Sequence, residues 1–170
     1  MSPSAYIGFG SNLGDRKTKF QEALRALEDL PKTSLKARSR LYETDPVDLS
    51  DHGSKFLNAV ILVETDLSPR ELIGSMRSIE LALGKSVHHR SDKSRVIDLD
   101  LLLYGDDHFL EDDFEVPHPR MSNRYFVLAP LAELAPNILI PTLGRTVEDL
   151  VRLLPERELA GVRPLDFENE

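Results

Sequence analysis

The chain has 170 residues, of which 41% are hydrophobic and 29% charged, proportions typical of one soluble domain with a single sizeable core. A formal net charge of −8 argues against non-specific nucleic-acid binding, and the lack of cysteine excludes disulfides, thiolate catalysis and cysteine-ligated zinc. No apolar run reaches the length of a membrane span, and no signal-peptide pattern opens the chain. We therefore expect a cytoplasmic protein, most simply a monomer, whose partners are small molecules.

The start of the chain predicts a strand and a helix. Ala5–Gly10 alternates enough to form a first strand, which a Gly-Ser-Asn turn ends. Gly8 and Gly10 begin like a dinucleotide-binding fingerprint, but Leu13 stands where the third glycine belongs, so we interpret both glycines as devices of a tight turn. Asp15 can cap the helix that follows, whose apolar stripe comprises Phe20, Ala23, Leu24, Leu27 and Leu30.

Two more strands and a second helix follow. Ser34–Glu43 predicts the second strand, Val47–Lys55 a polar loop, and Phe56–Glu64 a third, largely buried strand. The capping box Ser68-Pro69-Arg70-Glu71 marks the start of the second helix. Gly84 is expected to end it.

The stretch Arg95–Tyr104, RVIDLDLLLY, has the apolar content of a buried strand but contains two aspartates. Residues two apart on a strand share a face, so Asp98 and Asp100 point the same way and Leu99 points the other way. Two neighbouring carboxylates repel each other and lose hydration unless a cation compensates, and such pairs suit Mg²⁺. The alternative is that both acids lie in water at a fraying strand end.

The order strand, helix, strand, strand, helix, strand predicts a ferredoxin-like βαββαβ fold of the α+β class. We expect an antiparallel sheet with both helices on one face, the last strand between the first and the third, and the other face free for a ligand. A helical extension follows, with helices over Leu128–Leu134 and Thr146–Leu154. The whole chain, residues 1–170, is expected to form one domain with its core at about 5–154 and a loosely ordered tail at 155–170.

Positive charge gathers in the sequence around the two acids. The loop before the aspartate strand and a later helix contribute Lys85, Arg90, Arg95 and Arg124, and such a cluster in an acidic protein favours a small polyanion. Metal ions ringed by Arg and Lys are typical of phosphoryl-type transfer. Each residue also has an ordinary explanation: Arg124 could form a surface ion pair and His118 a rigid turn. Phe56 and Phe126 could be core aromatics, and Asn58 could serve only to satisfy backbone groups.

Three segments together resemble the 6-hydroxymethyl-7,8-dihydropterin pyrophosphokinase family of folate biosynthesis. They are AYIGFGSNLGDR, RVIDLDLLLYG and VPHPRMSNRYFVLAPLAELAP, and the resemblance runs from about Ala5 to Leu154. It implies an ATP-dependent enzyme that transfers the β,γ-diphosphate of ATP to the hydroxymethyl group of a reduced pterin and releases AMP. It also implies that Asp98 and Asp100 hold two Mg²⁺ ions.

The resemblance further implies roles for single residues. The catalytic set would be Lys85, Arg95, Asp98 and Asp100, with Lys85 and Arg95 gripping phosphates. The pterin pocket would comprise Thr44, Val47, Phe56, Asn58 and Phe126. The nucleotide would be bound by Arg77, Glu80, Arg90, Leu101, His118 and Arg124.

The chain departs from the family pattern in the basic loop. Lys85 replaces an arginine, Val87 a second basic residue and Asp92 a tryptophan, although Arg90 or Lys93 could compensate. Lysine does not bind phosphate in the bidentate way of arginine. We expect this loop and 47–55 to be flexible without ligand and to close on ATP and pterin. Two other functions stay open: a catalytically silent nucleotide-binding regulator on the same fold, and a two-metal phosphohydrolase.

Overall fold

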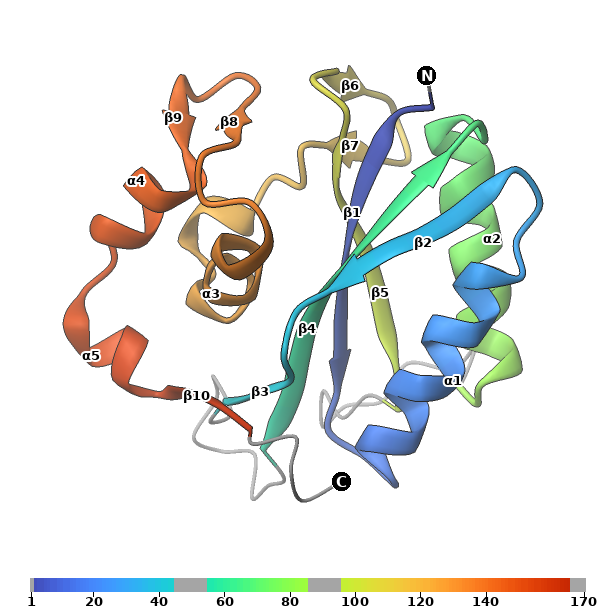
Figure 1. Cartoon of the computed structure of the whole chain (residues 1–170), viewed down its shortest axis with the longest axis horizontal. Coiled ribbons are helices and arrows are strands. Elements are labelled where there is room, and N and C mark those ends of the chain that lie inside the picture. Colours follow the sequence, from blue (N-terminus) through green and yellow to red (C-terminus); the bar gives the residue numbers. More distant parts are fainter. Residues whose placement is uncertain (1, 45–54, 86–95, 166–170) are drawn as a thin grey trace.

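The computed structural model describes residues 2–44, 55–85 and 96–165 (Figure 1). The two predicted loops, 47–55 and 85–94, lie almost wholly outside these ranges, so their closure on ligands stays a prediction. Within the ranges, no helix has both the length and the apolar character needed to cross a bilayer.

The first part of the chain builds the sheet and its two covering helices. Its elements are β1 Ser4–Ser11, α1 Arg16–Glu28, β2 Thr33–Arg38, β3 Tyr42–Thr44, β4 Phe56–Thr65, α2 Pro69–Ala82 and β5 Asp98–Tyr104. The second part consists of short elements: β6 Phe109–Leu110, β7 Glu115–Val116, the 3₁₀ turn η1 Met121–Asn123, α3 Tyr125–Leu134, β8 Leu139–Ile140, β9 Arg145–Thr146, α4 Val147–Arg152, α5 Glu156–Ala160 and β10 Val162–Pro164.

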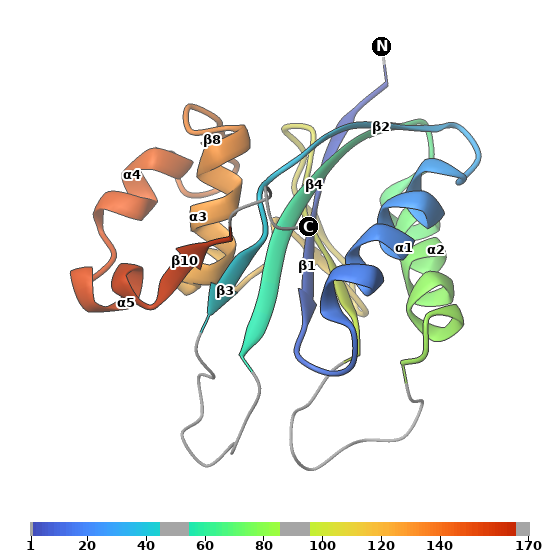
Figure 2. The ribbon, with the colours of Figure 1, turned by 60° about the horizontal axis from the view of Figure 1, so that its bottom comes forward.

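The main sheet is antiparallel, in the order β10-β3-β4-β1-β5, and β2 also pairs with β4. Helices α1 and α2 lie together on one face (Figure 2). This arrangement confirms the predicted ferredoxin-like α+β fold with two helices on one face. The place of the last strand was predicted wrongly: within the described residues β5 pairs with β1 alone and forms an edge. The reason is that β4 pairs with β1 along its whole length, from Ser4 to Ser11, which leaves the other side of β1 for β5.

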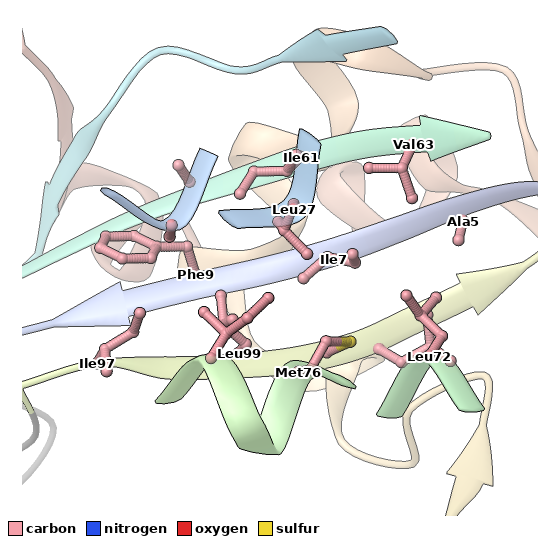
Figure 3. Close-up of a cluster of buried hydrophobic side chains, with 14 of the residues drawn as sticks. Ala5, Ile7, Phe9, Leu27, Ile61, Val63, Leu72, Met76, Ile97 and Leu99 are labelled. Carbon is pink, nitrogen blue, oxygen red and sulfur yellow. The ribbon is translucent and has the colours of Figure 1, made fainter. Parts of the chain in front are cut away.

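A dry core fills the space between the sheet and the two helices (Figure 3). Apolar side chains of the strands meet those of the helices there, and the labelled members include Ile7, Phe9, Leu27, Ile61, Leu72, Met76 and Leu99. The side chain of Leu99 belongs to this core, so the alternation of β5 turns Asp98 and Asp100 to the opposite face.

The helical extension covers part of that opposite face, which Figure 1 shows with α3 lying across from α1 and α2. The prediction that this face is free of helices is therefore wrong for one half of the sheet. A second apolar core forms there because strand residues beyond the aspartates are large and apolar. It joins Tyr6, Val60, Leu102 and Leu103 to Met121, Leu128, Leu131 and Val147.

The local signals for the helix starts are confirmed. The Asp15 carboxylate accepts a hydrogen bond from the Thr18 amide (3.1 Å), and the Ser68 hydroxyl accepts one from the Glu71 amide (3.1 Å) with Pro69 as the first helical residue. Gly84 follows the end of α2 at φ +108°, a conformation that suits glycine.

Two other predictions about this part of the chain need correction. Gly8 and Gly10 lie inside β1 and not in a turn, which instead contains Gly14 at φ +71°. The strand predicted over Ser34–Glu43 divides into β2 and β3. Between these two strands, the Ser39 hydroxyl accepts a hydrogen bond from the Val60 amide (2.9 Å) in place of a strand partner.

The tail is ordered as far as the structure describes it, contrary to the expectation of a loose segment at 155–170. Residues 156–160 form α5, and β10 pairs with β3, with Val162 opposite Thr44. The Leu165 amide also donates to the Leu41 carbonyl (2.8 Å). β10 thus covers a strand edge whose backbone groups would otherwise be unpaired.

Candidate active site

The two aspartates lie at the end of a polar row that crosses three strands. In the sheet register Gly10 is opposite Asn58 on β4 and opposite Asp98 on β5, while Gly8 is opposite Asp100. Because neighbouring strands are roughly 4.8 Å apart, the Cα atoms of Asn58 and Asp98 are separated by about 10 Å. Gly10 places no side chain between Asn58 and Asp98, which leaves room for a ligand there, whereas the Leu102 side chain covers Gly8.

Asp98 and Asp100 are both partly exposed on this face, while Leu99 between them is buried. Asp98 Oδ1 accepts a hydrogen bond from Lys85 Nζ at 2.6 Å. Burial raises the pKa of Asp98 and the Lys85 charge opposes this, while the charges of Asp100 and Glu80 add to the rise. The Asp98 carboxylate therefore resists ionisation, and the Lys85 ammonium offsets this only in part.

The start of β5 is held by a buried carboxylate of α2. Glu80, whose side chain is 2% exposed, accepts hydrogen bonds from the Leu99 amide (2.8 Å), Lys85 Nζ (3.0 Å) and Arg77 Nη1 (2.5 Å). Arg77 Nη1 also donates to the Leu99 carbonyl (3.0 Å). Arg77 and Glu80 thus fix the backbone between the two aspartates, and Leu101 is buried in the core beneath them.

His118 lies close enough to Asp100 and Arg124 for both charges to act on it. The His118 amide donates to the Leu102 carbonyl (3.0 Å), and its Nδ1 accepts from the Arg120 amide (3.2 Å). Burial lowers the pKa of His118, the negative charge of Asp100 counteracts this, and the charges of Arg124 and Arg120 lower it further. A neutral His118 with Nδ1 occupied as an acceptor carries its proton on Nε2.

The far end of the polar row contains three of the residues predicted for the pterin pocket. Asn58 Nδ2 donates to Thr44 Oγ1 at 2.8 Å, and both residues are buried. Thr44 is paired in register with Phe56, which is half-buried. Phe126 lies on α3 with the Arg124 guanidinium 5.6 Å from its ring centroid. The structure thus brings Thr44, Phe56 and Asn58 together at the same end of one face.

The sequence pattern of the 7,8-dihydro-6-hydroxymethylpterin-pyrophosphokinase (HPPK) family matches residues 6–136 of this chain. The chain belongs to the HPPK family. Among its relatives is the 2-amino-4-hydroxy-6-hydroxymethyldihydropteridine pyrophosphokinase of Pseudomonas aeruginosa, 39% identical over 91% of this chain and 94% of the relative. The enzyme of the same name from Bacillus subtilis is 40% identical over 81% of each chain.

Solved structures with this fold include an HPPK-DHPS in complex with substrates (TM-score 0.69, 14% identity) and Plasmodium falciparum HPPK-DHPS A437G with STZ-DHP (TM-score 0.71, 15% identity). Each match covers 89% of this chain but only 43% and 45% of the solved chain, respectively, so this chain spans less than half of their length. At 14% and 15% identity, this similarity supports a shared fold alone.

The carboxylates of Asp98 and Asp100 suit an Mg²⁺ ion that binds together with a nucleotide. Among residues 2–44, 55–85 and 96–165, no group of three or more His, Cys, Asp or Glu side chains could enclose a metal ion. Within the same residues, no hydrogen bond or ion pair engages the Asp100 carboxylate. Mg²⁺ commonly binds one or two carboxylates and takes its other ligands from water and substrate phosphates. Asp98 and Asp100 suit that mode of binding in this HPPK member.

Three of the predicted site residues, Val47, Arg90 and Arg95, lie outside the described residues, and their roles stay predictions. Gly8 and Gly10 were assigned to a turn, although both lie in β1, where Gly10 separates Asn58 from Asp98. Their spacing of two was the available signal, because it places both on one face of a strand. Which residues lie opposite them depends on the pairing of β1 with β4 and β5.

Proposed function

We propose that this HPPK member transfers diphosphate from ATP to 6-hydroxymethyl-7,8-dihydropterin. The hydroxymethyl oxygen of the pterin forms a bond to the β-phosphorus of ATP, and the bond between that phosphorus and the oxygen bridging to the α-phosphate breaks. AMP leaves with that oxygen, and the hydroxyl proton passes to solvent. The observation that carries this proposal is the row from Asn58 through Gly10 to Asp98, which offers a heterocycle site and a metal site on one surface.

Asp98 and Asp100 would hold two Mg²⁺ ions. When bound, these ions neutralise the phosphate oxygens and align the triphosphate with the attacking oxygen. Lys85, whose ammonium lies at Asp98, and Arg95, three residues before Asp98, add positive charge for the phosphates. Arg90 in the same loop has the same role.

The pterin would lie over the end of the row formed by Thr44 and Asn58. The amide of Asn58, held by Thr44, presents its Oδ1 to a ring N–H group, and a fixed amide selects for the donor pattern of the ring. Phe56 and Phe126 would contribute aromatic faces for stacking, and Val47 an apolar edge.

On the nucleotide side, neutral His118 would donate a hydrogen bond from Nε2, and Arg124 would neutralise phosphate charge. Arg77, Glu80 and Leu101 act indirectly in this proposal, because their contacts hold the β5 backbone that carries the aspartates. We further propose that a single chain suffices for activity and that it acts in the cytoplasm. Sedimentation of the active species should give a monomer, and a dimer would contradict the first of these proposals.

The test is to incubate the chain with ATP, Mg²⁺ and 6-hydroxymethyl-7,8-dihydropterin and to separate the products. AMP and pterin diphosphate in equal amounts, with no AMP when pterin is omitted, is the expected result. AMP with free pyrophosphate would instead identify a phosphohydrolase. Nucleotide binding without any AMP would identify a silent regulator, and either result overturns the proposal.

A further inference from the structure

A lysine ammonium group lies where a metal ion would bind Asp98. Lys85 Nζ is 2.6 Å from Asp98 Oδ1 and 3.0 Å from Glu80 Oε2, so it bridges one partly exposed and one buried carboxylate. The Lys85 side chain is 27% exposed, which places this bridge largely out of water. An ion pair so little hydrated is harder to replace than one on the surface.

We propose that Lys85 holds the place of a magnesium ion at Asp98 until the nucleotide binds, so that the metal enters with ATP and does not preload the site. This inference rests on the proposed function and adds a specific role for Lys85. The ammonium and a metal ion compete for Asp98 Oδ1, because both need its lone pairs and repel each other. A metal ion alone must therefore displace Lys85, whereas a metal ion with ATP supplies phosphate oxygens that the displaced ammonium can bind.

Glu80 makes this exchange possible. Its carboxylate is fixed by the Leu99 amide and Arg77, so it stays in place when Lys85 leaves Asp98. The Lys85 ammonium then keeps its contact with Glu80 Oε2 and turns its remaining protons toward the triphosphate. The charge of Lys85 thus moves from the metal ligand to the substrate without ever lacking an acceptor.

The test measures binding of Mn²⁺, a spectroscopic substitute for Mg²⁺, by electron paramagnetic resonance in the absence of nucleotide. Lys85→Met is expected to bind Mn²⁺ roughly tenfold more tightly than the wild-type chain. In this variant the metal ion does not have to break a charge-assisted hydrogen bond at Asp98 in order to bind. Lys85→Arg, which restores a cation at Asp98, is expected to bind Mn²⁺ as weakly as wild type. Adding Asp98→Asn to Lys85→Met should abolish the gain.

Lys36→Met is the matched control. It makes the same substitution at a lysine that pairs with Glu64 (3.7 Å) and not with Asp98, so its Mn²⁺ affinity should change less than about twofold. Equal Mn²⁺ affinity of wild type and Lys85→Met would overturn the inference, and so would an equal gain in Lys36→Met. If Lys85→Met does not fold, the wild-type chain decides: Mn²⁺ should bind far more tightly with α,β-methylene-ATP than alone, and equal affinities would overturn the inference.

These outcomes separate the inference from the proposed function. The binding measurement uses no pterin and no turnover, so it can succeed or fail independently of the product assay. A wild-type chain that makes no pterin diphosphate but shows the Lys85→Met gain would retain the placeholder role and lose the enzymatic one.

Discussion

The two faces of β5 differ sharply, although they belong to the same seven residues. Leu99 and Leu101 are buried against α1 and α2, in a core that excludes water. Asp98 and Asp100 on the other face are partly exposed and bring two negative charges together. One face of the strand belongs to the core and the other carries the proposed metal ligands, so substitutions a single residue apart should separate stability from turnover.

The largest expected effect is on turnover. Asp98→Ala and Asp100→Ala should each lower kcat by about a thousandfold or more, because in the proposed function each removes a ligand that positions the metal and phosphates. Their unfolding free energies should stay within about 1 kcal/mol of wild type, since neither side chain belongs to the core. Product assays and urea denaturation measure the two quantities, and an active variant of either kind contradicts the metal role.

The converse substitution tests the core face. Leu99→Ala should lower the unfolding free energy by about 2–5 kcal/mol, because it leaves a cavity among buried side chains. Leu81→Ala is the matched control, since Leu81 is 52% exposed on α2 and should tolerate the same change with a loss below about 1 kcal/mol. Urea denaturation without ligands compares them; equal losses would mean that the two faces do not differ as described.

A smaller effect is expected at the glycine between the two ends of the polar row. A Cβ at residue 10 would lie 3.2 Å from Asn58 Oδ1, so Gly10→Ala should displace that amide and raise the KM for pterin about tenfold. Gly74→Ala is the control, because its Cβ would meet nothing within 4 Å and should leave the kinetics unchanged. Steady-state kinetics distinguish these outcomes; an unchanged pterin KM in Gly10→Ala would remove Asn58 from the pocket.

The smallest effect concerns the tail. Deleting residues 162–170 removes β10 and exposes the outer edge of β3, which carries Thr44. The pterin KM should rise a few-fold while the KM for ATP stays constant, because the metal end of the row is on β5. Deleting only 166–170 is the control and should change neither value; equal effects of both deletions would contradict a role for β10.

Signals that act within one element were predictable from the sequence. Ser68 and Asp15 cap helices through neighbours three residues away, and the shared face of Asp98 and Asp100 follows from strand alternation alone. The strand order was not predictable in the same way, because the edge position of β5 depends on how far β4 pairs with β1.

The same distinction applies within the site. Glu80 is fixed by Leu99 on β5 and by Lys85 beyond the end of α2, so its buried bridging role depends on the packing of α2 against β5. The tail was predicted to be loosely ordered because its composition is polar and contains prolines. Pairing with β3 outweighs that composition, because an open strand edge offers backbone partners that do not depend on side-chain type.

The central claim is that two aspartates on one face of β5 share magnesium ions with the triphosphate. A crystal structure of the chain with Mg²⁺, α,β-methylene-ATP and 6-hydroxymethyl-7,8-dihydropterin tests it most directly. We expect metal ions within about 2.1 Å of carboxylate oxygens of both Asp98 and Asp100, with phosphate oxygens as further ligands. Carboxylates that point to separate surroundings, with no cation between them and the phosphates, would contradict it.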